Sequence, residues 1–530
     1  MRRFISYGPV NAKLHYHAPR EELINRAYTQ LMGENPRDGG HYITVWAPRQ
    51  TGKTWLMQQI LFRLNKDEEF DVFKINLEHL KDQVDPHKII ISIAETIGER
   101  LGKTFKGIND IKEFQGIFKK GVLSKPLILI LDEFDALCEE GINAVVSALR
   151  NIYVTRMDEM DKPTKQRSYL LHGVALIGIR SVLGIGSAKG SPFNVQRSLH
   201  VPNLTYKEVE GMFKWYEKES GQQIQPEVIT KLFDETRGQP GLTCWFGELL
   251  TETYNEDKKQ PINMGVFEKA YTAASILLPN ANVLNIISKA KQEPYKELVL
   301  ELFRTNDLMD FKFDDEEINF LYMNGVIEPE TLSNKEIVVR FANPFLQKRL
   351  FNYFSSELFD VMGRLVAPFD KLEDAITEDT LNIRALMKYY QEYLLKNSQW
   401  LFKNVPRRKD LRIYEAVFHF NIYMYLFQLL KRRGGEVHPE FPTGNGKIDI
   451  VIKYRNQVYG LELKSYTDYA NYKNALNQAA SYAMQLGLKE MSLIFFIESI
   501  DEENREKYEK NYIDKDTGVN VAPIFVETGE

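Results

Sequence analysis

The sequence predicts an α/β protein with a parallel sheet in its first part and a separate mixed α/β domain in its last part. Between residues 41 and 185, short apolar runs alternate with helix-like segments, as in a parallel sheet with crossover helices. The expected strands are 42–46, 72–75, 127–131 and 174–179. Alternation of strands and helices returns only after about residue 370, with strands expected at 448–454, 458–464 and 492–497.

Between these two parts the pattern is mainly helical. Residues 206–220 and 226–235 have helical periodicity without strong strands, which indicates a helical lid. A short helix at 316–323 ends at Gly325, and strands at 326–327 and 337–341 flank a turn with Pro329 and Asn334, which suggests a winged helix. The predicted regions are a core at 1–200, a lid at 201–280, a winged-helix-like domain at 281–360, and a helical connection with the mixed domain at 361–530.

Length and composition indicate an ordinary globular protein. The 530 residues suggest roughly two to four domains. A net charge of -5 gives no general attraction to nucleic acid, although a local basic patch stays open. With only two cysteines and nine histidines, none at metal-ligand spacing, we expect a cytoplasmic protein without zinc. The start of the chain has no signal-peptide core and the longest apolar runs are short, so no membrane segment is expected.

One loop has the pattern of a phosphate-binding loop. It follows the first expected strand, opens a helix, and reads Ala47-Pro48-Arg49-Gln50-Thr51-Gly52-Lys53-Thr54. Backbone N–H groups of such a loop point at phosphates, Lys53 adds positive charge, and the Thr54 hydroxyl can ligate Mg²⁺. Ala47 departs from the glycine of the common pattern. The loop predicts binding of ATP or GTP together with Mg²⁺.

Two carboxylates follow the buried strand at 127–131. Asp132 suits Mg²⁺ coordination at the carboxyl end of a parallel strand. Glu133 is then the candidate to orient or deprotonate the attacking water. The alternative for both motifs is a surface turn and an ordinary buried strand that ends in acids.

The stretch from 16 to 252 resembles the AAA-like P-loop ATPases related to the signal-transducing (STAND) group. The resemblance rests on the loop above and on four further segments: Leu131-Asp132-Glu133-Phe134-Asp135, Gly178-Ile179-Arg180, Ser191-Pro192-Phe193-Asn194 and Gly238-Gln239-Pro240-Gly241. It implies a P-loop NTPase sheet, that Arg180 senses the γ-phosphate, and that the turn before Pro240 lies near the nucleotide. Without the resemblance, Arg180 is expected to be a solvated or salt-bridged side chain, and Gly238-Gln239-Pro240 is expected to be an ordinary turn.

The last part of the chain carries a second group of charged residues. Glu462 and Lys464 project to one side of an expected strand, and Leu461 and Leu463 to the other. If this strand pairs antiparallel with the preceding one, Asp449 comes close to Glu462, and the two carboxylates can hold a divalent metal beside Lys464. Phosphodiester hydrolysis is the chemistry this set predicts. An exposed hairpin with a Glu/Lys ladder is the alternative.

Residues 411–530 resemble the PD-(D/E)XK nuclease superfamily, through Asp449…Glu462-Leu463-Lys464. The resemblance implies a restriction-endonuclease-like mixed α/β fold, a helical glutamate before the first strand and a helical glutamine after the lysine. Glu415 and Gln478 match these positions. Read alone, Glu415 is a solvated helix residue and Gln478 a surface amide.

DNA is the expected partner, and a homo-oligomer stays open. A local excess of positive charge supports DNA, although cations at helix ends explain part of it equally well: Lys403, Arg407, Arg408, Lys409, Arg412, Lys431, Arg432 and Arg433. The main hypothesis is an ATP-dependent or ATP-gated DNA endonuclease, with a role in defence against foreign DNA by analogy. The alternative is a non-cleaving regulatory or signalling NTPase that binds DNA or protein.

Overall fold

A computed structural model of the chain divides into two compact units, Met1–Tyr271 and Thr272–Glu530. The structure describes residues 1–105, 107–108, 110–178, 197–255, 257–303, 308–359, 372, 374–408, 413–431, 433–440, 449–466 and 468–529. For Arg197, Glu440 and Asp449 it describes the backbone alone.

The first unit contains a five-stranded parallel sheet in the order β2-β3-β4-β1-β5. Its strands are β1 (Tyr42–Trp46), β2 (Asp71–Asn76), β3 (Leu127–Asp132), β4 (Leu171–Gly178) and β5 (Arg197–His200). The predicted parallel α/β sheet is therefore confirmed. The apolar side chains of each strand face both sides, because helices cover both faces of the sheet.

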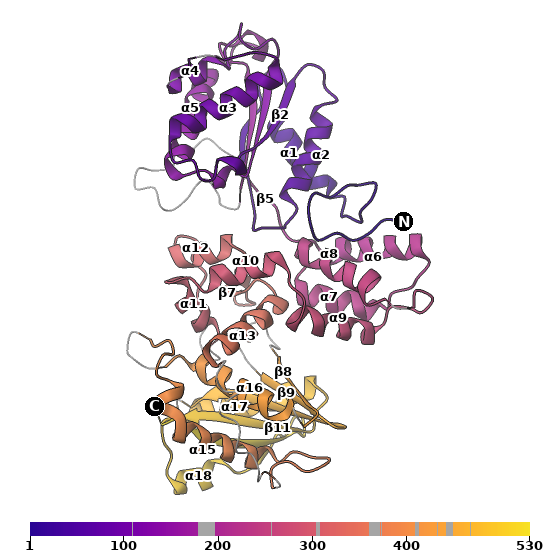
Figure 1. Cartoon of the computed structure of the whole chain (residues 1–530), viewed down its shortest axis with the longest axis vertical. Helices are drawn as coiled ribbons and strands as arrows, with labels where there is room; N and C mark the ends of the chain where they lie inside the picture. Colours follow the sequence, from indigo (N-terminus) through magenta and orange to yellow (C-terminus); the bar gives the residue numbers. More distant parts are fainter. Residues whose placement is uncertain are drawn as a thin grey trace. The chain divides into compact units, whose positions relative to one another are not determined.

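Two groups of helices cover this sheet (Figure 1). One face packs against α1 (Glu21–Met32) and α2 (Lys53–Leu64). The other packs against α3 (Pro86–Leu101), α4 (Ile111–Gly116) and α5 (Glu139–Asp158). The loop after β1 leads directly into α2, so the carboxyl edge of the sheet carries the predicted phosphate loop.

The region for which the sequence predicts a helical lid, called the lid below, follows the sheet. It contains α6 (Tyr206–Ser220), α7 (Pro226–Thr236), α8 (Pro240–Glu248) and α9 (Met264–Ile276). Thr205 and Glu208 form a capping box at the start of α6, which fixes where that helix begins. The N-terminal segment packs on α6: the rings of Phe4 and Phe213 stack at 4.8 Å, and the Arg2 guanidinium lies 4.4 Å from the Trp215 ring centroid. The two helices predicted for this region are confirmed.

The second unit begins with α10 (Ala281–Ala290), α11 (Tyr295–Leu302) and α12 (Glu316–Met323), then a two-stranded antiparallel sheet and α13 (Pro344–Phe359). The strands are β6 (Ile327–Thr331) and β7 (Ile337–Phe341). The prediction that Pro329 lies in the turn is wrong, because Pro329 lies within β6 opposite Val339. A strand with one neighbour tolerates proline, since the missing N–H can face away from the partner.

A six-stranded mixed sheet forms the last part of the chain, in the order β12-β13-β11-β10-β9-β8. Its strands are β8 (Gly435–Glu440), β9 (Asp449–Tyr454), β10 (Gln457–Ser465), β11 (Glu490–Ile497), β12 (Tyr512–Ile513) and β13 (Asn520–Glu527). Its helices are α15 (Ile383–Leu401), α16 (Glu415–Lys431), α17 (Tyr469–Gln485) and α18 (Glu502–Tyr508).

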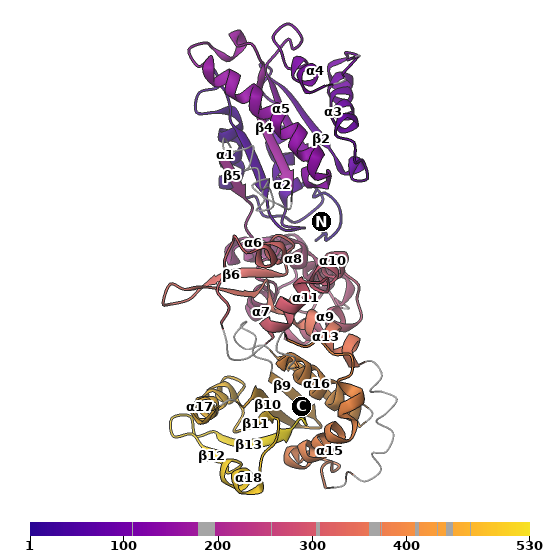
Figure 2. The ribbon, with the colours of Figure 1, turned by 90° about the vertical axis from the view of Figure 1, so that its left-hand side faces the viewer.

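Helices cover both faces of this sheet (Figure 2). Leu493 and Phe495 of β11 pack under α17, whereas Phe496 of the same strand stacks on Phe418 of α16 with ring centroids 5.6 Å apart. Strand alternation thus sends neighbouring residues to opposite helices. Within the described residues, no helix is both long and apolar enough to cross a membrane.

Candidate functional site

The predicted phosphate loop connects the end of β1 to the start of α2. Gly52 takes a left-handed conformation with φ of 92° and precedes the first turn of α2, which contains Lys53 and the exposed Thr54. The Lys53 ammonium donates hydrogen bonds to the carbonyls of Ala47 at 2.6 Å and Pro48 at 2.7 Å. A Cβ atom on Gly52 would meet no atom within 4 Å. The loop is therefore open beside the N-terminus of α2, where backbone N–H groups favour an anion.

The lid contacts this loop through the turn that the resemblance singled out. The side-chain amide of Gln239 donates to the carbonyl of Arg49 at 3.2 Å, and the N–H of Gly241 donates to the carbonyl of Gln50 at 3.1 Å. Pro240, between them, is the first residue of α8. Within the loop, the Thr51 hydroxyl donates to the carbonyl of Pro48 at 2.9 Å. The turn thus holds the phosphate loop by its backbone.

Two acids lie at the carboxyl end of β3, as the sequence predicts. Asp132 is buried, with one carboxylate oxygen 2.7 Å from the ammonium of Lys74 and the other 3.1 Å from the N–H of Glu133. Glu133 has a left-handed φ of 55°, which turns the chain sharply after the strand. Burial, with the nearby Asp135 and Asp132 carboxylates, raises the pKa of Glu133. A raised pKa favours proton uptake, as a general base requires.

Lys53 faces these acids across the site. Burial lowers the pKa of Lys53 to about 8, although Asp135, Glu133 and Asp132 oppose this shift, in that order. Asp135 therefore belongs to the charge set of the site. It also lies against the end of β4, because a Cβ atom on Gly178 would be 2.7 Å from its Oδ1 atom.

Sequence reasoning assigned no role to Asp135 or Lys74. Asp135 carried a signal, since it is the third acid of the segment after β3. Lys74 had little signal in the sequence, because its contact with Asp132 depends on the register between β2 and β3. Arg180, expected to sense the γ-phosphate, lies outside the described residues.

In the second unit, the register of β9 and β10 confirms the predicted antiparallel hairpin. Asp449 is the residue directly opposite Glu462, and the turn falls at 455–456. Glu462 and Lys464 are 2% and 3% exposed, and the Lys464 ammonium lies 3.2 Å from Glu462 Oε1. The alternative of an exposed Glu/Lys ladder is therefore wrong. These charges are inside the fold, next to two buried leucines on the opposite face of the strand.

Two helices bring further polar groups to the end of β10. Glu415, the first residue of α16, accepts a hydrogen bond from the N–H of Ser465 at 3.2 Å. Gln478 of α17 accepts one from the Lys464 ammonium at 3.2 Å. The four predicted side chains Glu415, Glu462, Lys464 and Gln478 thus come together around one strand. The expectation that Glu415, read alone, is a solvated residue is wrong. Gln478 is exposed, as expected of a surface amide, and it also accepts the hydrogen bond from Lys464.

The sequence analysis did not assign His419 to this cluster. It is fully buried one turn after Glu415, with Nε2 3.7 Å from the Glu415 carboxylate, and burial lowers its pKa to about 4. A helical spacing of four from Glu415 was the available signal. Among the side chains that the structure describes, which exclude that of Asp449, no three His, Cys, Asp or Glu residues lie close enough to hold a metal ion.

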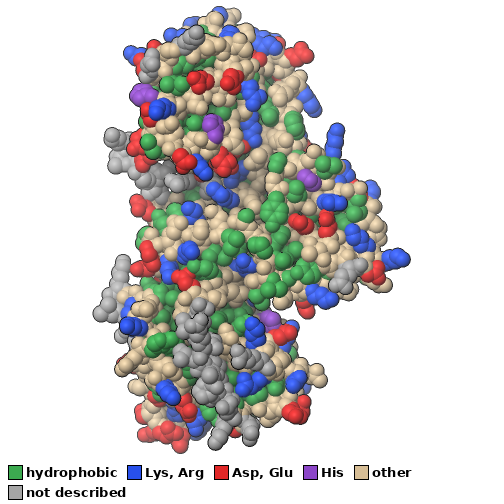
Figure 3. Space-filling view, viewed as in Figure 1, with side chains coloured by type: hydrophobic (Ala, Val, Ile, Leu, Met, Phe, Trp, Pro, Cys, Tyr) green, Lys and Arg blue, Asp and Glu red, His purple; other side chains and the backbone are tan. Residues whose placement is uncertain are grey.

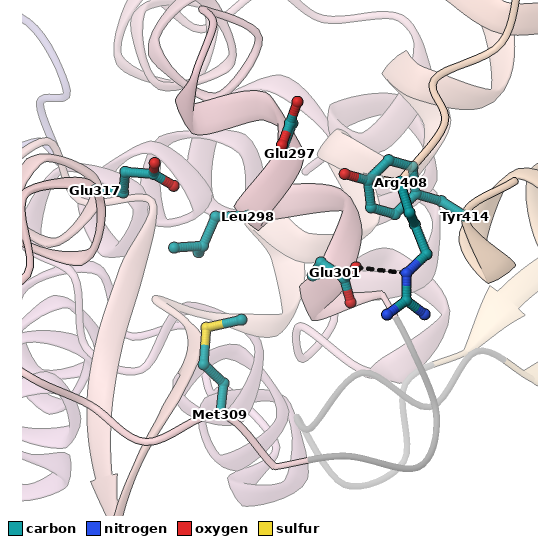
Figure 4. A pocket seen from close by; sticks show the side chains of 7 residues that line it. All are labelled: Glu297, Leu298, Glu301, Met309, Glu317, Arg408 and Tyr414. Carbon is teal, nitrogen blue, oxygen red and sulfur yellow. Dashed lines mark ion pairs between the residues drawn. The ribbon is translucent and has the colours of Figure 1, made fainter. Parts of the chain in front are cut away.

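The expected basic contacts to DNA are partly engaged within the protein. Arg408 lies 3.7 Å from Glu301 at the wall of a hollow of about 390 Å³ (Figure 4). The hollow is lined by Glu297, Leu298, Glu301, Met309, Glu317, Arg408 and Tyr414. Arg433 donates to the carbonyl of Leu429 at 3.0 Å, as a cation at a helix end does. Lys409, Arg412 and Arg432 lie outside the described residues.

On the face seen in Figure 3, acidic and basic side chains are interspersed. A surface of this kind does not present one large positive field. Charge spread over this face therefore does not by itself indicate a nucleic-acid partner.

Comparison with known proteins places an AAA domain in the first unit. The model of the ATPase family associated with various cellular activities (AAA) matches residues 43–184. This range contains the phosphate loop, Asp132 at the end of β3, Glu133 directly after it, and strand β4. The chain thus contains an AAA ATPase domain. No curated protein matches the chain.

Three solved structures are similar to part of the chain. The Aeropyrum pernix Orc1 protein in complex with DNA is 17% identical, over 66% of this chain and 94% of that one, with a TM-score of 0.34. A Walker-type ATPase of Pyrococcus abyssi is 13% identical, over 66% and 99%, with a TM-score of 0.41. The Holliday junction branch migration motor RuvB of Thermotoga maritima is 14% identical, over 61% and 92%, with a TM-score of 0.35.

Proposed function

We propose that this chain is an ATP-gated DNA endonuclease, in which the first unit hydrolyses ATP and the second unit cleaves phosphodiester bonds with the aid of a divalent metal. The observation that carries the nuclease half is the buried Glu462–Lys464 pair. A buried ion pair adds little stability, because the cost of removing both charges from water offsets their attraction. Asp449 of the neighbouring strand is opposite Glu462 in the register, and this placement favours chemistry over stability as the reason for these residues.

In the ATPase half, each residue has a separate task. The N–H groups at the start of α2 and the Lys53 ammonium bind the triphosphate, which displaces that ammonium from the carbonyls of Ala47 and Pro48. Thr54 and Asp132 are the residues that would hold Mg²⁺, a hard cation that prefers oxygen ligands. When bound, Mg²⁺ neutralises charge on the β and γ phosphates. Glu133 orients and deprotonates the attacking water, for which its raised pKa is suited.

In the nuclease half, Asp449 and Glu462 are the residues that would hold the metal, since they are opposite one another in the register of β9 and β10 and carboxylates supply hard oxygen ligands. When bound, the metal activates the attacking water and neutralises charge on the scissile phosphate. Lys464 stabilises the charge that develops on that phosphate, and Gln478 holds the Lys464 ammonium in place. Glu415 holds the end of β10 through the N–H of Ser465.

Gating is proposed to start at the lid. Gln239 and Gly241 bond to the carbonyls of Arg49 and Gln50, so a change in the loop on binding triphosphate reaches the lid helices directly. Bound nucleotide then favours one arrangement of the chain over another, to the extent that it binds that arrangement more tightly. The α10–α12 helices with the β6–β7 hairpin are proposed to be a winged helix that contacts DNA or protein.

The experiment is a cleavage assay of the full chain on plasmid, linear duplex and single-stranded DNA, with and without Mg²⁺, and with ATP or ADP. The proposal predicts cleavage that needs both Mg²⁺ and ATP and that Lys464→Met abolishes. ATP hydrolysis without cleavage of any of these DNAs would replace it with the non-cleaving regulatory NTPase.

A further inference from the structure

The carboxylate of Asp132 already has a cation beside it. The Lys74 ammonium lies 2.7 Å from Asp132 Oδ2, and the two side chains are 22% and 4% exposed. The other oxygen, Oδ1, accepts the N–H of Glu133 at 3.1 Å. Both oxygens of the residue expected to serve Mg²⁺ are therefore engaged within the protein.

The sheet itself makes this contact. β2 and β3 are parallel neighbours, with Asn76 opposite Asp132 and Lys74 opposite Ile130. Residues two apart in a strand share a face, so Lys74 and Asp132 lie diagonally across adjacent strands on one face. Ile130 packs in the core that α2 covers. Lys74 and Asp132 therefore lie on the sheet face that is covered by α2, the helix that directly follows the phosphate loop.

The two lysines of the site have different direct partners. The Lys53 ammonium donates hydrogen bonds to the carbonyls of Ala47 and Pro48. Lys74 forms the direct ion pair with Asp132. A buried carboxylate without a counter-charge is costly, and a triphosphate nearby would add repulsion. Lys74 therefore offsets the Asp132 charge by direct contact.

We propose that Lys74 is a positioning residue that takes the place of Mg²⁺ beside Asp132, and that it thereby sets how strongly nucleotide binding depends on Mg²⁺. Two cations compete for one carboxylate, so the ammonium weakens Mg²⁺ binding at that residue. The same ammonium lets the triphosphate approach when Mg²⁺ is missing. By linkage, the factor by which Mg²⁺ tightens nucleotide binding is smaller with Lys74 than without it. This inference rests on the proposed nucleotide site.

The test measures the dissociation constant of a fluorescent ATP analogue on the full chain, once with Mg²⁺ and once with EDTA. The ratio of the EDTA value to the Mg²⁺ value reports the dependence on Mg²⁺. In Lys74→Met this ratio is expected to rise on the order of tenfold, mainly because binding in EDTA weakens against the uncompensated Asp132 charge. A purely structural role would weaken binding by the same factor in both conditions and leave the ratio unchanged.

Two backgrounds make the test specific. In Asp132→Asn, the further change Lys74→Met should leave the ratio unaltered, because no carboxylate remains to be neutralised. Lys74→Arg keeps the cation and should keep a ratio close to that of the wild type. Lys165→Met removes a lysine from an exposed ion pair with Glu69 in the same unit, at 3.2 Å, and should change neither constant.

A ratio that stays constant or falls in Lys74→Met would overturn the inference, as would an equal rise in the Asp132→Asn background. If Lys74→Met does not fold, as a melting curve would report, Lys74→Gln replaces it with the same expected ratio. A wild-type chain that binds no nucleotide in either condition would instead contradict the proposed function. The two failures are thus distinguishable.

Discussion

Gly241 of the lid lies so close to Gln50 of the phosphate loop that a Cβ atom on Gly241 would be 2.2 Å from Gln50 Oε1 and 2.8 Å from Gln50 Cβ. The N–H of Gly241 also donates to the Gln50 carbonyl at 3.1 Å. Gln50 itself has a left-handed φ of 58°. The lid therefore fixes an unusual backbone conformation within the phosphate loop, and glycine is what allows the approach.

Gly241→Ala is expected to weaken ATP binding about tenfold, although it removes no group that contacts phosphate. The added methyl must displace Gln50, and overpacking of this kind costs about 1–3 kcal/mol. Gly211→Ala is the matched control, because Gly211 lies in the lid helix α6 and a Cβ there meets no atom within 4 Å. Titration with a fluorescent nucleotide compares the two; equal affinity in both variants would show that the lid does not shape the loop.

Lys53→Ala and Glu133→Gln should separate binding from turnover. Loss of the Lys53 ammonium is expected to weaken triphosphate binding about tenfold to a hundredfold, since a hydrogen bond to a charged group contributes about 1.5–3 kcal/mol. Glu133→Gln should bind ATP like the wild type and hydrolyse it about 10²–10⁴-fold more slowly. Calorimetry and a phosphate-release assay give the two quantities. Normal affinity in Lys53→Ala would remove the phosphate-loop assignment.

Much of the first unit could be predicted because its signals are local. The expected strand at 42–46 is β1, and the other three expected strands match β2, β3 and β4 to within a few residues, since strands buried on both faces read as continuous apolar runs. The loop between β1 and α2 was equally visible. The Lys74–Asp132 pair was not, because one polar residue in a strand does not reveal which neighbouring strand it faces.

In the second unit, the pairing of Asp449 with Glu462 could be predicted from a short hairpin, but β13 could not. Pro523 interrupts its pattern, and proline argues against a central strand. The structure accommodates it because β12 pairs only with Asn520 and Val521, so at Pro523 one side of β13 has no strand among the described residues. Burial of Glu462 and Lys464 was also hidden, since it depends on how α16 and α17 pack against β10, which the strand pattern alone does not reveal.

Acid should destabilise the first unit through His172. This ring belongs to β4 and is fully buried, its Nε2–H donates to the carbonyl of Met32 at 2.9 Å, and burial lowers its pKa to about 3. The unfolded chain, with a histidine pKa of about 6.5, then binds the proton more readily than the folded one. Stability is therefore lost as pH falls below about 6.5, by about 2 kcal/mol at pH 5.

His172→Gln should remove that part of the pH dependence, since an amide still donates to Met32 but does not titrate in this range. Urea unfolding followed by tryptophan fluorescence at pH 7 and pH 5 gives the shift in midpoint for each protein. His79→Gln, at an exposed position, is the control and should behave like the wild type. An equal midpoint shift in His172→Gln and the wild type would contradict the assignment to this ring.

The proposed control of metal-dependent cleavage in the second unit by nucleotide in the first can be checked in one cleavage assay on four proteins. Mg²⁺-dependent DNA cleavage and ATP hydrolysis are measured in parallel for the wild type, Lys53→Ala, Lys464→Ala and Lys489→Ala, an exposed lysine of the second unit. We expect that Lys464→Ala loses cleavage but keeps ATP hydrolysis, that Lys53→Ala loses both, and that Lys489→Ala keeps both. Cleavage that survives Lys464→Ala would contradict the nuclease site, and cleavage that persists unchanged in Lys53→Ala would contradict the gating.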